Sequence, residues 1–342
     1  MKTRIYIAIV IIFCLAPGLA LAKTPTKTPV KLFYYVDNDN AYRSLKANAK
    51  GIDILAPQSY NVDELGILKG KIPDRVTEVA KKYKIKLMPL VVNKQFSQDK
   101  IHSVLTNDLA QNAAILNMIA EAKIHGYIGW QFDFEHISSV DKELYASFVE
   151  RAGKEFHTSG LQFSVAVAAI DDKSETEYPE LSWLNWSGAF DYARIGAAAD
   201  FVSIMTYDQP FSPGPTATLP WMENIMRYAT TQIPASKISL GIPAYAWHWY
   251  DGTNEFVGTG GYKKIGVRLK EKRYTEIGYS EELGTPWMRY EKDDVLYKTW
   301  YENRKSFVAK TALVKKYKLH GYSMWVLGLE DPKIWMNVPK RK

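Results

Sequence analysis

Two acidic residues that lie two positions apart are the groups in this sequence best suited to acid–base chemistry. Asp133 and Glu135 end the run 127–135, and in a strand their side chains share one face while Trp130, Phe132 and Phe134 occupy the other. Because the flanking segments have helical patterns, both faces are expected to be buried, as in a parallel sheet covered by helices. Two enclosed carboxylates do not both ionise readily, so one pKa rises and that group stays protonated near neutral pH. A protonated acid beside an ionised one is what a glycosidase uses to protonate a leaving oxygen.

Two other interpretations of this acidic pair remain open. A strand end at the surface with two solvated acids would show the same spacing. A metal site at Asp133, Glu135 and His136 is the second interpretation, but His136 points away from Glu135 if the strand continues. The sequence contains no further cluster of His or Cys to support a metal, so no metal ion and no other cofactor are expected.

The segments around the pair alternate between strand-like and helix-like patterns. Strands are expected at 32–36, 52–56, 85–92, 127–135, 161–169, 201–207, 238–245 and 321–326. Helices are expected at 42–48, 72–83, 107–123 and 142–157, the third with Leu109, Ala113, Leu116 and Ile119 on one face, the fourth with Tyr145, Phe148, Val149, Ala152 and Phe156. This order predicts the α/β class, a (β/α)8 TIM barrel, with a small α+β insertion at 251–300 between strands seven and eight. An open doubly wound sheet is the alternative, but the first strand lacks the Gly-rich phosphate turn of that fold.

The first 22 residues are typical of a secretory signal peptide. Lys2 and Arg4 precede an apolar run at 6–15, and residues 20–22 provide a small-residue cleavage site. A membrane anchor is the alternative, but the run is shorter than the ~20 residues of a spanning helix. We therefore expect a mature chain of 23–342, secreted or periplasmic and without stable membrane insertion. Cys14, the single cysteine of the sequence, lies within the run, so no disulfide is expected.

Composition limits the classes of partner. Two of the 44 basic residues lie in the expected signal peptide, which leaves a mild excess over the 37 acidic ones, so no nucleic acid partner is expected. Ten Trp and 22 Tyr residues suit a groove that stacks sugar rings, although a large core also uses aromatic residues. The oligomeric state is not visible in the sequence.

In a (β/α)8 barrel, reactive side chains lie at the carboxyl ends of the strands. The segments expected there, besides Asp133 and Glu135, are Gln58-Ser59-Tyr60, Met205-Thr206-Tyr207-Asp208, Pro243-Ala244-Tyr245 and Ser323-Met324-Trp325. They would form a ring of carboxylates, phenols and an indole at one end of the barrel.

Residues 129–135 resemble the strand-four signature of family 18 glycoside hydrolases, the chitinase-like enzymes, whose pattern is D-x-x-D-x-D-x-E. Segments similar to other motifs of this family follow in the same order, at 205–208, 241–245, 325–328 and 330–332. Residues 44–48 and 285–287 are similar to the subgroup that contains spore-cortex glucosaminidases. The first two aspartates of the pattern fall at Ile128 and Gln131, so two of its acids remain.

The resemblance implies retaining, substrate-assisted cleavage of β-1,4 bonds next to N-acetylglucosamine. Glu135 would be the general acid, Asp133 would orient the acetamide N–H, and Tyr207 would bind the acetamide carbonyl. Contacts with the sugar are implied for Gln131, Met205, Asp208, Tyr245 and Trp325. Since an amide at 131 hydrogen-bonds Asp133 without taking up charge, the pKa of Glu135 is expected to depend on Asp133 alone. Two roles are possible for Trp183, Trp186, Trp247 and Trp249: they line outer sugar subsites, or they pack in the core or in loops.

The expected partner is an N-acetylglucosamine-containing polysaccharide or oligosaccharide, with chitin and peptidoglycan not distinguished. The alternative function is a non-catalytic, lectin-like member of the same fold. Glu135 favours hydrolysis, because lectin-like members typically lose the acid. A metal-dependent deacetylase is a third possibility, which predicts acetate release and inhibition by chelators.

Overall fold

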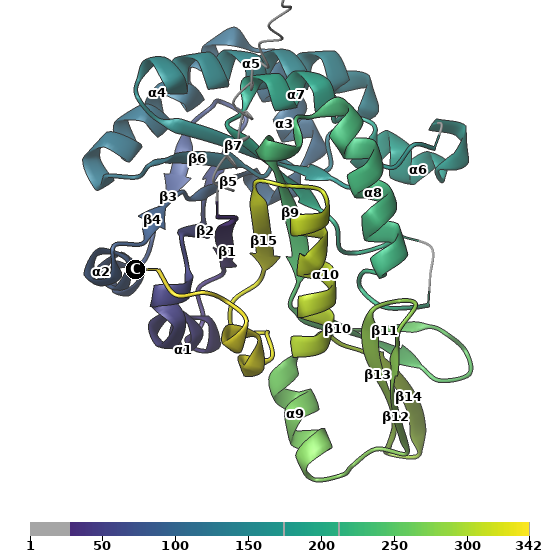
Figure 1. Ribbon diagram of the computed structural model, residues 1–342. Helices are drawn as coiled ribbons and strands as arrows, with labels where there is room; N and C mark the ends of the chain where they lie inside the picture. Colours follow the sequence, from purple (N-terminus) through teal and green to yellow (C-terminus); the bar gives the residue numbers. More distant parts are fainter. Residues whose placement is uncertain (1–27, 174, 211–212, 342) are drawn as a thin grey trace, which may run out of the picture.

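Eight parallel strands form a closed barrel in the computed structural model, which describes residues 28–173, 175–210 and 213–341 (Figure 1). The strands are β1 (Val30–Tyr35), β2 (Ile54–Val62), β5 (Leu90–Asn93), β6 (Gly129–Phe132), β7 (Gln162–Ala168), β8 (Phe201–Met205), β9 (Ile238–Pro243) and β15 (Gly321–Trp325). β1 pairs with β2 on one side and with β15 on the other, which closes the ring. Two short strands pair with β2: β3 (Leu68–Gly70) is antiparallel to it and β4 (Lys86–Leu87) is parallel. The predicted TIM barrel is confirmed.

The helices lie around the outside of the barrel (Figure 1). They are α1 (Asp39–Asn48), α2 (Asp74–Tyr83), α3 (Gln98–Leu105), α4 (Asp108–His125), α5 (Lys142–Thr158), α6 (Glu180–Ser182), α7 (Tyr192–Ala198), α8 (Leu219–Gln232) and α10 (Arg304–Lys316). The predicted inner face of α5 is confirmed, since all five of its aromatic and aliphatic residues are buried. None of the helices in the described ranges is long and apolar enough to cross a membrane. The predicted signal peptide lies outside the described residues.

The predicted inner face of α4 is wrong. Leu109 is 79% exposed and Leu116 is 65% exposed, whereas the small residues Ala110 and Ala114 are buried. The buried face is the neighbouring one, in which three alanines alternate with Gln111, Ile115 and Met118. The indole of Trp130 donates a hydrogen bond to the carbonyl of Met118 at 2.8 Å.

The expected third and fourth strands are shorter than their sequence patterns. Pro89 cannot donate to a ladder, and the segment 85–92 divides there into β4 and β5. β6 ends at Phe132, although the backbone amide of Asp133 still donates to the carbonyl of Val91. Gly129 begins β6 with φ at 157°, and a side chain there would place its Cβ 1.8 Å from the carbonyl oxygen of Gln162. Only glycine therefore allows β6 and β7 to pair at this point.

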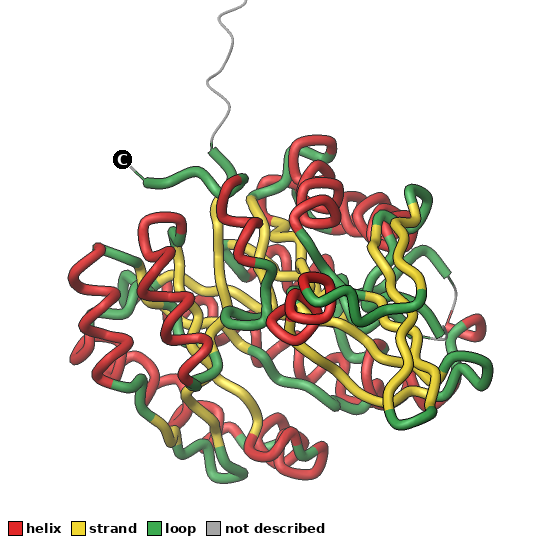
Figure 2. Tube along the Cα trace, turned by 90° about the horizontal axis from the view of Figure 1, so that it is seen from below, coloured by secondary structure: helices red, strands yellow, loops and turns green. Residues whose placement is uncertain are grey.

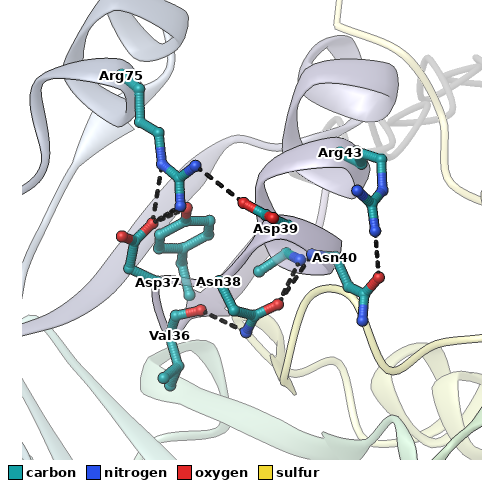
Figure 3. A network of polar contacts seen from close by, with 9 residues as sticks. Val36, Asp37, Asn38, Asp39, Asn40, Arg43 and Arg75 are labelled. Atoms are coloured by element: carbon teal, nitrogen blue, oxygen red, sulfur yellow. Dashed lines mark hydrogen bonds and ion pairs between the residues drawn. The ribbon is translucent and has the colours of Figure 1, made fainter.

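The loop at the carboxyl end of β1 is fixed by local polar contacts. After β1, the side chain of Asn38 caps α1 by accepting from the backbone amides of Asn40 and Ala41 (Figure 3). Arg75 of α2 donates to Asp37 at 2.8 Å and to Asp39 at 3.3 Å, which ties the first two helices to the end of β1.

A second sheet of five antiparallel strands projects from the barrel between β9 and α10 (Figures 1 and 2). Its strands are β10 (Tyr245–Tyr250), β11 (Phe256–Gly261), β12 (Glu276–Ser280), β13 (Thr285–Lys292) and β14 (Val295–Trp300), with α9 (Tyr262–Lys270) between β11 and β12. α9 packs on one face through a small core that includes Ala246, Ile265 and Met288. Since β10 begins two residues after β9, the sheet stands at the carboxyl end of the barrel.

Candidate active site

A cleft of about 620 Å3 opens at the carboxyl ends of the barrel strands. Its polar lining consists chiefly of acidic and phenolic groups: Tyr34, Gln58, Asp133, Glu135, Asp171, Tyr178, Tyr207 and Asp208. Its aromatic lining includes Phe96, Trp186, Trp221 and Trp325. The structure thus brings acid groups and flat apolar rings together in one concave site, which suits a sugar ligand.

The acidic pair stands in this cleft because β6 ends directly beneath it. Asp133 is 4% exposed, and Glu135 is half-buried. Asn93, at the end of β5, holds the main chain of Glu135 on both sides: its Nδ2 donates to the carbonyl oxygen and its Oδ1 accepts from the amide, each at 3.0 Å. The side chain of Gln58 donates to Asp133 Oδ2 at 3.5 Å. These contacts fix the two carboxyl groups next to each other.

Burial changes the acidity of both carboxyl groups. The pKa of Glu135 is raised well above its ordinary value, first by burial, then by the charges of Asp133 and Asp208. The pKa of Asp133 is also raised by burial, but hydrogen bonds from Gln58 and Glu135 oppose this rise. Glu135 is therefore the carboxyl that keeps its proton, and Asp133 the one that ionises first. The expectation that the pKa of Glu135 depends on Asp133 alone is wrong, because burial and Asp208 contribute as well.

Asp208 reaches the cleft from the loop after β8 and is held by Tyr245. The Tyr245 hydroxyl donates to Asp208 Oδ1 at 2.5 Å, and burial raises the pKa of the Asp208 carboxyl. Tyr245 is not among the described residues that line the cleft, so its contact with the site runs through Asp208. Tyr207 does line the cleft, with its ring edge-on to that of Tyr245 and its pKa raised by burial.

Gln131 lies inside the barrel, beneath the cleft. Its Nε2 donates to the hydroxyls of Ser164 at 2.7 Å and Ser203 at 3.0 Å. The expected hydrogen bond from Gln131 to Asp133 is not formed, and Gln58 takes that place. Gln131 is fully buried and is not among the described residues that line the cleft. It still acts on one cleft residue, because its side chain opposes the rise that burial causes in the pKa of Tyr34.

The remaining candidates divide between the cleft and its surroundings. Trp325 and Met205 line the cleft, and the Trp325 ring packs on Tyr34 with centroids 5.3 Å apart. Trp186 also lines it and meets His136 edge-on. Trp183 instead packs against the barrel core and Tyr178.

Two further tryptophans lie on β10, outside the lining of the cleft. Trp247 and Trp249 contact each other and Phe256, and the Trp249 indole donates to the carbonyl of Gly214 at 2.9 Å. Gly214 belongs to the loop that follows β8, which also carries Gln209 to the cleft. The pair therefore stands beside the cleft rim.

Sequence reasoning missed several residues of the site, and three of them are informative. Tyr34 lines the cleft floor near Asp133, Asn93 positions Glu135, and Trp221 reaches the cleft from the first turn of α8. Tyr34 and Asn93 each fall at the end of a barrel strand, so the strand-end rule that selected Gln58 could have included them. Trp221 carries no such signal, because its position depends on the path of the loop after β8.

The arrangement suits proton transfer to a bound ligand. Glu135 supplies a protonated carboxyl, Asp133 and Asp208 supply carboxylates, and Tyr34 and Tyr207 supply hydroxyl groups to the same cleft. Within the described residues no group of three His, Cys, Asp or Glu side chains is arranged to hold a metal ion.

Comparisons with known proteins agree on one family. The sequence model described as glycosyl hydrolases family 18 matches residues 31–330. The chain is 29% identical to the uncharacterized glycosylase YvbX of Bacillus subtilis, over 90% of each chain, and 26% identical to the cortical fragment-lytic enzyme of the same organism, over 87% of this chain and 70% of that one. Among solved structures, a chitinase from Chromobacterium violaceum superposes with a TM-score of 0.82 at 29% identity, covering 91% of this chain and 98% of that one. The spore cortex-lytic enzyme SleL of Bacillus megaterium gives 0.81 at 26% identity, covering 92% and 75%.

Proposed function

The chain belongs to glycosyl hydrolases family 18 and is a glycosidase, and we propose that it is exported and cleaves β-1,4 bonds next to N-acetylglucosamine. The observation that carries the proposal is the buried acid Glu135, which keeps its proton in a cleft beside the more acidic Asp133. One carboxyl is thereby ready to donate a proton while its neighbour carries charge.

In the proposed first step, the Glu135 carboxyl gives its proton to the glycosidic oxygen. The bond between that oxygen and the anomeric carbon breaks, and the carbonyl oxygen of the sugar's own 2-acetamido group bonds to the anomeric carbon. The product is a cyclic oxazolinium ion, so no protein nucleophile is needed. Asp133 orients the acetamide N–H and stabilises the positive charge that develops on it. Tyr207 donates to the acetamide carbonyl.

In the proposed second step, the ionised Glu135 takes a proton from a water molecule. The water oxygen bonds to the anomeric carbon, the oxazolinium ring opens, and the sugar leaves with its original configuration. Glu135 recovers the proton that it gave up. Asp208 would hold sugar hydroxyls, and the Trp325 ring, which lines the cleft, would lie under the sugar.

The mechanism limits the substrate to glycans with an N-acetyl group on the cleaved sugar. Chitin oligosaccharides and peptidoglycan strands both meet this condition. We propose peptidoglycan or its short fragments as the preferred substrate, since two Bacillus relatives are described as cortical fragment-lytic or cortex-lytic enzymes. Gln131 and Tyr245 act indirectly in this proposal, through the barrel interior and through Asp208 respectively.

The test is an assay of new reducing ends with chitooligosaccharides and with purified peptidoglycan. The wild-type protein should release reducing ends from at least one substrate, and Glu135→Gln should lower kcat by about 10²- to 10⁴-fold with the fold intact. Asp171→Asn is a control, because Asp171 lines the same cleft without a role in proton transfer. Binding without cleavage by the wild type would favour a lectin-like function, and full activity of Glu135→Gln would refute the role of Glu135.

A further inference from the structure

A second hollow, of about 590 Å3, lies at the opposite end of the barrel from the cleft. Three segments meet there: 46–52 at the end of α1, 81–86 at the end of α2, and 332–341 at the end of the described chain. The first two lead into β2 and β4, so they mark the amino ends of the strands. Arg341 ties the segments together, since its backbone amide donates to the carbonyl of Lys50 and its guanidinium to the carbonyl of Lys84.

These three segments are strongly basic, and we call their surface the basic pole. They contain no acidic residue and nine basic ones: Lys46, Lys50, Lys81, Lys82, Lys84, Lys86, Lys333, Lys340 and Arg341. The other 35 basic residues of the chain face 37 acidic ones, so the basic pole determines the sign of the net charge of +7. The cleft, in contrast, is lined by four carboxyl groups and one lysine.

Helix stabilisation accounts for part of this charge. Lys46, Lys81 and Lys82 lie in the last turns of α1 and α2, where a cation interacts favourably with the helix dipole. Arg341 caps backbone carbonyls. The remaining five lysines, Lys50, Lys84, Lys86, Lys333 and Lys340, are exposed and form no ion pair with any acidic residue in the described ranges. The neighbouring carboxylate of Asp53 is already paired with Lys31 at 2.8 Å.

The hollow also presents apolar groups. Trp335 and Tyr83 line it together with Met336, whose side chain is 70% exposed. Of these three, Met336 is exposed, whereas Trp335 and Tyr83 are half-buried and show one edge to the hollow. Apolar groups surrounded by lysines are typical of protein surfaces that rest on anionic lipid, because the ammonium groups meet the headgroups while the apolar groups enter the interface.

The chain enters the barrel at the same place. The carbonyl of Lys31, near the start of β1, accepts from the backbone amide of Asp53, which directly follows the segment 46–52. The start of β1 therefore lies beside the basic pole.

We propose that the basic pole is a docking surface for an anionic phospholipid bilayer and turns the cleft away from the membrane, toward the surrounding glycan. Each lysine near an anionic bilayer strengthens binding about fivefold, so neutralising three of them should weaken it by about a hundredfold. The inference goes beyond glycan cleavage, and lipid binding and hydrolysis are measured separately, so that either can fail alone.

The test is sedimentation of the exported protein with vesicles of phosphatidylglycerol and phosphatidylcholine, and with vesicles of phosphatidylcholine alone. Binding should require phosphatidylglycerol and decrease with salt, because salt screens surface charges. The triple variant Lys46→Gln, Lys50→Gln, Lys340→Gln should lose about a hundredfold in affinity and keep its activity on soluble oligosaccharides. The matched control is Lys263→Gln, Lys264→Gln, Lys270→Gln on α9, which removes the same charge from exposed positions at the cleft end of the molecule.

Three outcomes would overturn the proposal. Equal binding to both kinds of vesicle, or equal affinity of the two triple variants, would show that the basic pole does not recognise anionic lipid. Soluble polyphosphate that competes fully at an equal concentration of phosphate would show a general polyanion site rather than a lipid surface.

Discussion

Glu135 and Glu302 both have a pKa that burial raises, and they differ in what stands beside the carboxyl. Glu135 lies in the cleft next to Asp133, with the charge of Asp208 nearby, and borders open space. Glu302, between β14 and α10, is 6% exposed and pairs with the fully buried ammonium group of Lys310. In both places burial is the largest cause of the raised pKa.

The difference shows that a raised pKa alone does not identify a catalytic acid. At Glu302, the opposite charge of Lys310 offsets part of the effect of burial, and the pair holds the segment after β14 against α10. At Glu135, like charges add to burial, so the carboxyl holds a proton that a ligand in the cleft can reach. Neighbouring charge and access to the cleft together separate the two roles.

The largest expected effect is on stability, at the ion pair. Lys310→Met leaves Glu302 buried without its partner, which should lower the free energy of unfolding by about 3–5 kcal/mol. Urea unfolding followed by circular dichroism measures this loss. The double variant Glu302→Gln, Lys310→Met should recover most of it, and kcat of the folded protein should stay at the wild-type level in both. A large loss of kcat in folded Lys310→Met would contradict the purely structural role of the Glu302–Lys310 pair.

The next effect is on catalysis, at Asp133. Asp133→Asn removes the negative charge that is proposed to stabilise the acetamide, so kcat should fall by about 10²- to 10³-fold. Stability should not decrease, because the carboxyl is buried without a cationic partner. Steady-state kinetics on a soluble oligosaccharide, with Asp171→Asn as the control, measures the change. A loss no greater than that of the control would contradict the role of Asp133.

The sequence predicted which residues lie in the cleft better than it predicted what sets their pKa values. The alternation in 127–135 and the strand-end rule correctly placed Asp133, Glu135, Tyr207, Asp208 and Trp325 at one end of the barrel. The influence of Asp208 on Glu135, and the diversion of Gln131 to Ser164 and Ser203, depend on where separate strands bring side chains in space. The exposed Leu109 of α4 has the same cause, since tertiary packing buries the neighbouring face with Ile115 and Met118 and leaves the face of Leu109 to solvent.

A smaller effect concerns pH. Glu135 acts in its protonated form, so activity should fall as pH rises through its pKa, which lies above the ordinary value for glutamate. Asp208→Asn removes one of the charges that raise this pKa, so the basic limb of the kcat profile should move to lower pH. Asp171→Asn should leave the limb in place, because Asp171 is not one of the groups that shift Glu135. If the basic limb of the profile did not move in Asp208→Asn, Asp208 would not contribute to the raised pKa of Glu135, and burial and Asp133 would be its causes.

The smallest effect is expected at Gln131, where the family pattern has a third acid. Its amide nitrogen is bound to Ser164 and Ser203, and its oxygen has no hydrogen-bond partner among the described residues, so it neither contacts Asp133 nor carries charge. Gln131→Met preserves the volume of the side chain and should change kcat less than threefold, roughly 0.6 kcal/mol in the barrier, with a loss of stability of about 1–2 kcal/mol from the two serine hydrogen bonds. Kinetics and urea unfolding of the same preparation separate these effects. If kcat fell as far as in Asp133→Asn, Gln131 would belong to the catalytic group. The reactive site would then extend below the cleft, into the interior of the barrel.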